Sequence, residues 1–370
     1  MPTWHRLGTR EELLARAPFA LRLDRHAVAV FFHDGAFRAI GNACNHKGGP
    51  LCEGRLRGEF VVCPWHGWEY SVVTGRGPEG YDEEQVPVFA VEERADGVYA
   101  ATPPTSPRKL VKHKPSHLLE EHPKPPGAPP RILGLSTTAM DEGNPRFSTS
   151  DALLEYALAD ASARQGADTK LVRLRDLAFR HCEGNYSKAA RACTWPCAIT
   201  ERDPTDQLDR VYEGLVHWAD VVLVATPIRW GAASSLYFKM AERMNCIQNQ
   251  ITIHDRVLIQ RKVAGFIITG GQDNVQAVAG GMLTFWSELG FLFPPFPFIA
   301  HSRGWAAEDT DENVRPVKAS TALRDAAAQL AERSLALFKV LDRHPEELAK
   351  PMEKVGRKAQ RLVARTEVTP

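Results

Sequence analysis

The sequence predicts two domains of different class: an all-β domain, then an α/β domain with a doubly wound, five-stranded parallel sheet. Short mixed segments with turns about every eight to twelve residues mark the first domain, over residues 1–102. Over residues 131–343, apolar runs alternate with helical spacings, which indicates parallel strands covered by helices on both faces. Between them, residues 103–130 contain nine prolines and predict an extended, polyproline-like linker.

Length and charge limit the classes of function. A chain of 370 residues with a net charge of +1 is expected to hold two domains and no basic surface for nucleic acid. Residues 1–10 have no apolar run, and no stretch approaches the roughly 20 apolar residues of a membrane span. Seven cysteines, an odd number, suggest no disulfide framework. We therefore expect a cytoplasmic protein without a membrane span.

The first domain is expected to consist of short antiparallel strands. A turn at His33-Asp34-Gly35 separates two of them. The predicted strands are Trp4–Gly8, Leu21–Val30, Phe37–Asn42, Val86–Val91 and Gly97–Ala101, with a short helical turn at Glu11–Leu14.

Two short motifs in this domain pair a cysteine with a histidine. Cys44 and His46 form a Cys-x-His motif, and after sixteen further residues Cys63 and His66 form a Cys-x-x-His motif. Two thiolates and two imidazoles can hold a [2Fe–2S] cluster, with cysteines on one iron and histidines on the other. The same four side chains also suit a tetrahedral structural zinc site.

The neighbouring residues favour iron. Gly48-Gly49-Pro50 follows the first motif and Gly67 the second, which suits tight loops whose N–H groups approach bridging sulfides. A zinc finger tends to carry its histidines on a helix, which glycine and proline disfavour. With these motifs, residues 1–102 resemble the Rieske ferredoxin family. The resemblance implies a [2Fe–2S] cluster with Cys44, His46, Cys63 and His66 as metal ligands.

Departures from the family pattern predict a low reduction potential. High-potential members carry two further cysteines in a disulfide, and the matching positions here are Gly49 and Trp65. A serine that donates to cluster sulfur in those members corresponds to Trp68, while Tyr70 is kept. With fewer hydrogen-bond donors to its sulfur atoms, the reduced cluster is stabilised less. We therefore expect a potential at the low end of the Rieske range.

In the second domain, five apolar segments predict the strands. The unbroken run Val221–Ala225 is typical of a strand buried on both faces. The other strands are predicted at Ile132–Leu135, Leu171–Leu174, Val263–Thr269 and Phe291–Ile299, and helices at 153–161, Gln207–Trp218 and Leu323–Leu341.

Polar and glycine-rich loops follow three of these strands. Ser136-Thr137-Thr138 ends the first strand, and Ser148-Thr149-Ser150 opens the next helix, where hydroxyls and N–H groups can bind an anion. Serine and threonine at a helix start are equally common as simple N-caps. Glycine and proline at 226–231 and 269–273 allow backbone to approach a flat ring. In a doubly wound fold these loops meet at one sheet edge.

Together these residues, over about 131–300, resemble the NADPH-dependent FMN reductase and iron–sulfur flavoprotein families of flavodoxin-like fold. The resemblance implies FMN as cofactor, NAD(P)H as donor, and a homodimer or homotetramer. Arg146, in a long loop over 139–147, is a further phosphate candidate. The implied phosphate ligands are Ser136, Thr138, Ser148, Thr149 and Ser150, and the implied ring contacts are Pro227, Ile228, Arg229, Trp230, Gly231, Thr269, Gly270 and Gly271.

The remaining residues suggest no acid or base catalyst. Cys182, Cys193 and Cys197 stand where iron–sulfur flavoproteins carry four cluster cysteines, but the spacing is incomplete, so we expect remnant thiols. His254, and His301 after the fifth strand, are expected in surface or capping roles. In the basic C-terminal tail, 344–370, Lys350–Arg365 is predicted to be a solvated helix.

The predicted function is a two-centre oxidoreductase that passes electrons between NAD(P)H, FMN and the cluster. FMN exchanges two electrons with a nicotinamide, and a Rieske cluster carries one. The expected acceptor is a quinone, a free flavin, dioxygen, a nitro or azo compound, or an oxygenase. The alternative is a non-catalytic electron carrier or redox sensor that acts on a partner protein.

Overall fold

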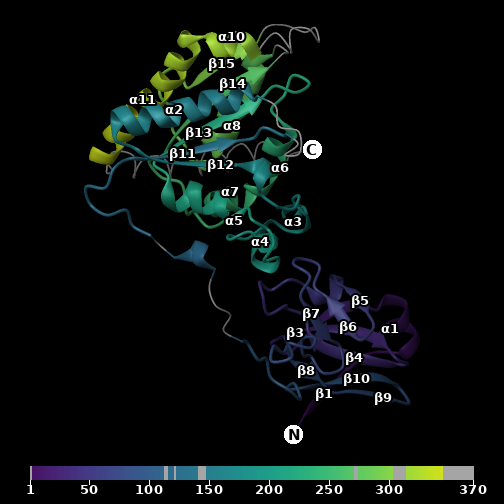
Figure 1. Ribbon diagram of the computed structural model, residues 1–370. Helices are drawn as coiled ribbons and strands as arrows, with labels where there is room; N and C mark the ends of the chain where they lie inside the picture. Colours follow the sequence, from purple (N-terminus) through teal and green to yellow (C-terminus); the bar gives the residue numbers. More distant parts are fainter. Residues whose placement is uncertain are drawn as a thin grey trace, which may run out of the picture. The chain divides into compact units, whose positions relative to one another are not determined.

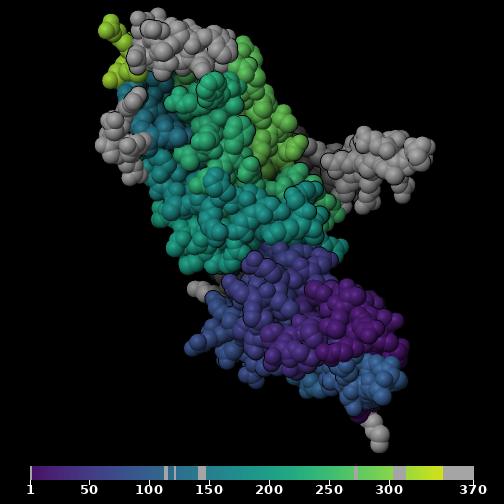
Figure 2. Space-filling view, turned by 90° about the vertical axis from the view of Figure 1, so that its right-hand side faces the viewer, coloured from purple at the N-terminus to yellow at the C-terminus, as the bar shows by residue number. Residues whose placement is uncertain are grey.

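The computed structural model describes residues 2–111, 116–120, 122–140, 147–270, 274–302 and 314–344. The chain divides into two compact units, of which the first comprises residues 1–115 with 184–193 and the second comprises 116–183 with 194–370. Residues 2–111 are coloured purple to blue in Figures 1 and 2, and residues 147–344 teal to yellow. No helix among the described residues is long and apolar enough to cross a membrane.

The first unit is built on small antiparallel sheets, as the turn spacing predicts. Its elements are β1 (Thr3–Gly8), α1 (Arg10–Arg16), β2 (Phe19–Leu23), β3 (His26–His33), β4 (Ala36–Gly41), η1 (Leu51–Glu53), β5 (Arg55–Arg57), β6 (Phe60–Val62), β7 (Glu69–Ser71), β8 (Val88–Phe89), β9 (Val91–Arg94), β10 (Gly97–Thr102), α3 (Asn185–Lys188) and η4 (Ala190–Ala192). The sheet orders are β1-β10-β9, β2-β3-β4-β8 and β5-β6-β7 (Figure 1).

The prediction of one strand over Leu21–Val30 is wrong, because this segment is a hairpin. Strand β2 ends at Leu23 and pairs antiparallel with β3, which starts at His26. Asp24, in the turn, has a φ of 49°, a left-handed conformation that aspartate tolerates. The next turn, at Asp34 and Gly35, lies at the predicted place, with φ values of 49° and 74° that suit a tight hairpin.

Part of the proline-rich stretch belongs to the first unit. Gln85 and Lys109 exchange backbone hydrogen bonds of 3.0 and 2.9 Å, and Thr105 N–H donates to Val88 O at 2.7 Å. These residues therefore complete an edge of a sheet, and the extended linker stays a prediction for the rest of the stretch. Further on, Leu118, in η2 (His117–Leu119), is buried in the second unit. The boundaries of the linker stay predictions.

The second unit has a five-stranded parallel sheet in the order β12-β11-β13-β14-β15, the order of a flavodoxin-like fold. The predicted fold class is thus confirmed. The elements are β11 (Arg131–Ser136), α2 (Thr149–Gln165), β12 (Asp168–Arg173), η3 (Leu174–Asp176), α4 (Ala198–Arg202), α5 (Asp209–Glu213), the π-helical turn η5 (Gly214–Trp218), β13 (Val221–Pro227), α6 (Ser235–Arg243), α7 (Asn245–Thr252), β14 (Val263–Gly270), α8 (Val275–Leu289), β15 (Phe298–Ser302), α10 (Val314–Ala319) and α11 (Thr321–Arg343).

The fifth strand begins later than predicted. The sequence indicated Phe291–Ile299, whereas β15 covers Phe298–Ser302 and pairs in parallel with β14. Prolines at 294, 295 and 297 remove ladder donors, which explains why residues 293–297 are not a strand. His301 consequently lies within the strand rather than after it.

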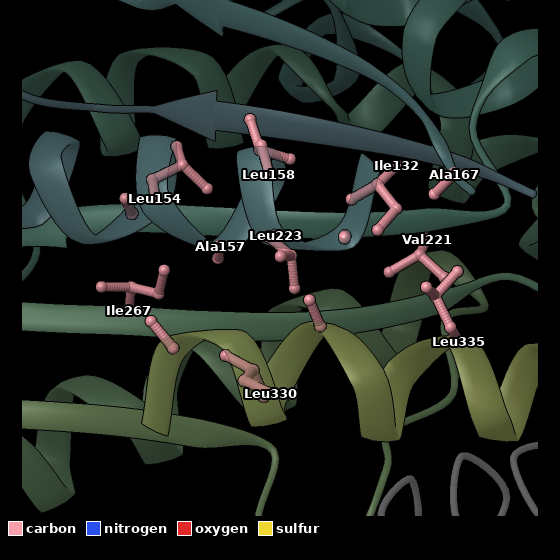
Figure 3. Close-up of a cluster of buried hydrophobic side chains, with 14 of the residues drawn as sticks. Ile132, Leu154, Ala157, Leu158, Ala167, Val221, Leu223, Ile267, Leu330 and Leu335 are labelled. Carbon is pink, nitrogen blue, oxygen red and sulfur yellow. The ribbon is translucent and has the colours of Figure 1, made fainter. Parts of the chain in front are cut away.

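Helices cover both faces of this sheet. On one face, α2 and α11 pack against β11, β13 and β14 through a cluster that includes Leu154, Leu223 and Leu330 (Figure 3). On the other face, the ring of Phe266 lies 6.3 Å from that of Trp286 in α8. Because alternate residues of one strand reach opposite helices, the central strands β13 and β14 are buried at every position. This layering fixes the strand ends that carry the predicted flavin loops.

We predict that Leu330→Ala lowers the free energy of unfolding of the second unit by about 2–5 kcal/mol. Leu330 is fully buried, and its Cδ1 would lie 3.0 Å from a Cβ added at Gly265, so its removal leaves a cavity against β14. Val340→Ala is the control, because Val340 is 54% exposed on the same helix. Urea unfolding followed by circular dichroism measures both, and equal midpoints for the two variants would contradict this account of the core.

Candidate functional site

The two loops that carry the predicted metal ligands share one backbone arrangement. In each, the cysteine N–H donates to the carbonyl five residues later, and a glycine N–H four residues later donates to the cysteine carbonyl. Gly48 and Gly67 have φ values of 78° and 76°, which would cost other residues about 1–2 kcal/mol. The distances are Cys44 N to Gly49 O 2.9 Å, Gly48 N to Cys44 O 2.9 Å, Cys63 N to Trp68 O 2.6 Å and Gly67 N to Cys63 O 3.0 Å.

The loops bring the two imidazoles together edge to face, with their planes 78° apart. Nδ1 of His46 lies 2.9 Å from Nδ1 of His66, and the ring centroids are 4.6 Å apart. Nε2 of His66 lies 2.5 Å from the carbonyl oxygen of Ala192, which belongs to the same unit. A carbonyl only accepts, so Nε2 carries the proton and Nδ1 keeps its lone pair for a metal.

The two histidines differ in exposure. His66 is 2% exposed. His46 is half-buried, and its ring stacks on Trp68 with centroids 5.1 Å apart and planes within 6°. His46 is thus the predicted ligand that reaches the solvent more easily.

The two thiols form a second, buried pair. Cys44 is 3% exposed and Cys63 is 2% exposed. The hydrogen bond from Cys44 lowers the pKa of the Cys63 thiol to about 7, whereas the same contact and then burial raise the pKa of Cys44. The pair therefore loses its first proton readily, and a bound metal would have to displace the second.

Tyr70 supplies a hydroxyl beside the first cysteine. Its Oη lies 3.9 Å from Sγ of Cys44 and accepts from the backbone N–H of Asn45 at 3.3 Å. Burial, followed by the neighbouring Cys44, raises the pKa of the Tyr70 phenol. The phenol therefore stays protonated and keeps a hydrogen to donate to a ligand sulfur.

The four predicted ligands form two pairs of like side chains. The thiols of Cys44 and Cys63 lie together, and so do the imidazoles of His46 and His66. Among the described residues, no three His, Cys, Asp or Glu side chains gather as they would around one ion. Two like pairs fit a cluster with cysteines on one iron and histidines on the other better than a single tetrahedral zinc. The residues present therefore fit the predicted group, and their role as ligands stays a prediction.

Gly49 explains why the disulfide of high-potential relatives has no counterpart. A Cβ at Gly49 would lie 2.8 Å from Sγ of Cys63 and 3.0 Å from the ring of Trp65. The indole of Trp65 thus occupies the space beside Gly49 where a second side chain would be needed. Among the seven cysteines, none forms a disulfide.

Sequence reasoning missed a polar network behind the first ligand loop. Asn45, between the two ligands of this loop, donates through Nδ2 to Glu84 Oε2 at 2.5 Å and to Lys109 O at 2.9 Å. Arg108 donates to Ala43 O at 2.9 Å and to Asn45 Oδ1. These partners are 39 to 65 positions apart in the chain, so no local spacing signals them.

In the second unit, the predicted phosphate residues gather at the start of α2. The hydroxyls of Thr138, Ser148 and Ser150 form a triangle with separations of 3.0 to 3.2 Å. Ser148 caps the helix by accepting from the N–H of Asp151 at 3.2 Å. Hydroxyls at a helix N-terminus suit a phosphate monoester, although several serve as caps among themselves.

Asp151 is a residue of this site that sequence reasoning missed. It is 7% exposed, it accepts from the hydroxyl of Ser136, and Nη1 of Arg175 donates to it at 3.0 Å. Ser136 therefore donates its hydroxyl hydrogen to Asp151. Its Oγ also accepts a hydrogen bond from the backbone N–H of Thr138 at 3.3 Å, which supports the loop. Arg175 balances the carboxylate charge beside a predicted anion site.

The predicted ring loops are held together across the sheet edge. Thr149 Oγ1 lies 2.6 Å from Thr269 Oγ1, which joins the start of α2 to the end of β14. A Cβ on Gly270 would lie 2.8 Å from Cβ of Ile228, so the two strand ends touch. Ser234, a missed residue whose position before α6 marks an N-cap, joins the same edge by donating to Thr137 O.

The loop after β13 exposes an aromatic ring. Trp230 is 94% exposed with a φ of 51°, and Gly231 follows with a φ of 69°. Asn274 Nδ2 donates to Gly231 O at 2.7 Å and fixes this turn. Arg229 and Ala232 exchange backbone hydrogen bonds of 2.8 and 3.0 Å within it, and Pro227 ends β13. Gly271 and Arg146 lie outside the described residues.

The three cysteines that iron–sulfur flavoproteins would use for a cluster are divided between the two units. Cys182 belongs to the second unit and Cys193 to the first. Cys197 is buried beside Cys246, whose hydrogen bond lowers the pKa of the Cys197 thiol to about 5. Arg243, which is 2% exposed, pairs nearby with Asp206 at 2.9 Å. The predicted tail helix lies outside the described residues.

We predict that Gly49→Ala prevents cluster assembly while leaving the second unit folded. The added methyl group would press on Sγ of Cys63 and on Trp65, and both belong to a packed loop. Iron analysis and visible absorbance of the purified variant measure the loss. Gly280→Ala is the control, because a Cβ there meets nothing within 4 Å. Wild-type iron content in Gly49→Ala would contradict the proposed ligand geometry.

Comparison with known proteins gives two matches that do not overlap. Residues 3–90 match the family described as Rieske [2Fe–2S] domain, and residues 131–306 match NADPH-dependent FMN reductase. Similar solved structures include RosB with a bound riboflavin phosphate intermediate, at 19% identity and a TM-score of 0.47 over 65% of this chain and 88% of that one.

The curated relatives each match one part of the chain. Ferredoxin CarAc of Metapseudomonas resinovorans is 32% identical over 80 residues, which are 22% of this chain and 75% of the ferredoxin. The oxygenase component of 3-ketosteroid-9-alpha-monooxygenase from Mycobacterium tuberculosis is 32% identical over 69 residues, 18% of each protein. The 8-demethyl-8-aminoriboflavin-5'-phosphate synthase of Streptomyces davaonensis is 26% identical over 175 residues, 45% of this chain and 60% of the synthase.

The chain spans 18% and 60% of the oxygenase component and the synthase, less than two thirds of their lengths. A Rieske domain implies a [2Fe–2S] cluster, and an FMN reductase domain implies FMN and NADPH. The chain therefore carries a Rieske [2Fe–2S] domain at residues 3–90 and an NADPH-dependent FMN reductase domain at residues 131–306.

Proposed function

We propose that this chain passes electrons from NAD(P)H through FMN and the Rieske cluster to a small acceptor or an oxygenase. One observation carries the proposal: a single chain holds two buried thiols with one buried and one half-buried imidazole, as well as a hydroxyl-lined helix start at a parallel-sheet edge. The first set suits a centre that carries one electron, and the second suits a flavin phosphate.

In the Rieske domain, the protein residues hold and orient the metal centre. Cys44 and Cys63 would hold one iron, and His46 and His66 would hold the other through Nδ1. The carbonyl of Ala192 keeps the proton of His66 on Nε2, and the hydroxyl of Tyr70 supports the sulfur of Cys44. These contacts set ring orientation and sulfur charge, which are the protein's means of tuning a cluster.

In the flavin domain, the protein residues bind and place the cofactor. Thr138, Ser148 and Ser150 would donate to the phosphate, with the N-terminus of α2 behind them. FMN, when bound, supplies two-electron chemistry with a nicotinamide and one-electron chemistry with a cluster. The close strand ends at Ile228 and Gly270 would receive the flat ring. The described residues around these loops thus bind and orient rather than transfer protons.

The acceptor is proposed from the relatives. A flavin is one candidate, because the Streptomyces relative is a riboflavin phosphate synthase. An oxygenase is another, because one relative is a ferredoxin and one is an oxygenase component. Quinones, dioxygen, nitro compounds and azo compounds remain proposals from the chemistry of FMN alone.

We predict that Thr138→Ala weakens the binding of FMN about tenfold or more and leaves the binding of riboflavin unchanged. One lost hydrogen bond to a charged group is worth about 1.5–3 kcal/mol. Titration of the flavin-free protein by fluorescence measures both ligands. Ser162→Ala is the control, since this exposed serine lies in the same helix away from its N-terminus. An equal loss of affinity for FMN and for riboflavin would show that Thr138 does not contact the phosphate.

We predict that anaerobic mixing with NADH or NADPH reduces the flavin before the cluster, in protein that holds about two irons per chain. Stopped-flow absorbance separates the two chromophores. Cys63→Ser is the matched variant, because it removes one predicted iron ligand and leaves the flavin domain intact. The variant should keep flavin reduction and lose the cluster signal. Flavin that neither nicotinamide reduces would refute the proposed donor, and turnover that requires a partner protein would favour an electron carrier.

A further inference from the structure

A buried carboxylate lies behind the first ligand loop. Glu84 is 3% exposed, and each of its two oxygens accepts a separate hydrogen bond. Oε2 accepts from Nδ2 of Asn45 at 2.5 Å, and Oε1 accepts from the backbone N–H of Val111 at 2.9 Å. Glu84 therefore connects the residue between Cys44 and His46 to a part of the chain far away in sequence.

The same loop is held from a second side by Arg108. This guanidinium donates through Nη1 to the carbonyl of Ala43 at 2.9 Å and to Oδ1 of Asn45. Asn45 also donates to the carbonyl of Lys109 at 2.9 Å. The side chain of Asn45 is thus fixed at its oxygen and at its nitrogen, and its backbone N–H donates to Tyr70 Oη.

Most of these partners come from outside the part of the chain that the Rieske match covers. The match ends at residue 90, whereas Arg108, Lys109 and Val111 belong to the proline-rich stretch. This stretch is anchored by the backbone pairing of Lys109 with Gln85, next to Glu84. The described beginning of the linker is therefore a strap on the ligand loop, over residues 105–111.

We infer that Glu84 and Arg108 are positioning residues of the iron–sulfur centre, which hold the Cys44–His46 loop in its ligand geometry through Asn45. This inference rests on the proposed function, because it takes the four predicted ligands to bind a cluster. Two residues of opposite charge act on the same loop. Both residues hold the ligand loop in place, and their opposite charges shift the reduction potential of the cluster in opposite directions.

A carboxylate is required at position 84 because two donors point at it. A glutamine has one acceptor oxygen and one amide nitrogen, so it would turn a donor toward either Asn45 or Val111. Two facing donors lose the hydrogen bond and leave a buried group unsatisfied. Glu84→Gln thus keeps the size of the side chain while releasing one end of the network.

The test compares Glu84→Gln and Arg108→Met with Glu83→Gln and Arg55→Met. The controls remove the same charges from exposed neighbours in the same unit. Release of iron to a chelator is followed by absorbance, and the reduction potential is followed by electron paramagnetic resonance. We expect about tenfold or faster cluster loss in Glu84→Gln and Arg108→Met. We also expect a higher potential for Glu84→Gln and a lower one for Arg108→Met.

The two variants are expected to shift the reduction potential in opposite directions. Damage to the fold alone would give no such opposite shifts, so the result distinguishes a charged positioning residue from a purely structural one. Arg108→Lys extends the test, because it keeps the charge but places its nitrogen one bond closer to the backbone than Nη1, the single nitrogen that contacts both Ala43 and Asn45. It should release the cluster faster than wild type and keep the wild-type potential. Wild-type release rates in both main variants, or potentials that move in the same direction, would overturn the inference. A wild-type protein without a cluster would instead overturn the proposed function beneath it.

Discussion

The approach of His46 Nδ1 to His66 Nδ1, at 2.9 Å, joins the two predicted ligand loops of the first unit. It brings together two loops that are not regular strands and that are partly buried, so every loop N–H and C=O needs a partner inside the protein. The left-handed glycines Gly48 and Gly67 provide those partners by turning the backbone back onto each cysteine. The Asn45 network then closes the side of the first loop that the sheets do not cover.

In the second unit, the predicted phosphate site lies next to an acidic residue. Asp151 orients the Ser136 hydroxyl and would repel a phosphate if its charge were alone. Arg175 contacts the same carboxylate at 3.0 Å, and Arg173 lies within 3.9 Å of it, so the local charge is balanced. The helix N-terminus and the hydroxyl triangle can then act on the anion. The parallel sheet makes this possible because it brings loops that are distant in sequence to one edge.

Local sequence patterns predicted those features whose defining residues are repeated or lie close together in the chain. The two Cys–His motifs located the cluster loops, and the apolar run at 221–225 located the central strand. The patterns failed where the decisive contact is distant. Leu21–Val30 looked like one strand, because apolar residues continue through a turn that only pairing reveals. Arg108 and Arg175 carried no signal, because their partners lie 63 and 24 positions away.

The reduction potential of the cluster follows from a balance that the sequence showed only in part. Trp68 stacks on His46 where high-potential relatives have a serine that donates to sulfur, so Tyr70 stands without that second donor. Fewer donors and the buried carboxylate of Glu84 both favour the oxidised cluster. Arg108 opposes them from the other side of Asn45. Because Glu84 is buried and Arg108 is exposed, the charge of Glu84 is screened less by solvent, which supports the prediction of a low potential.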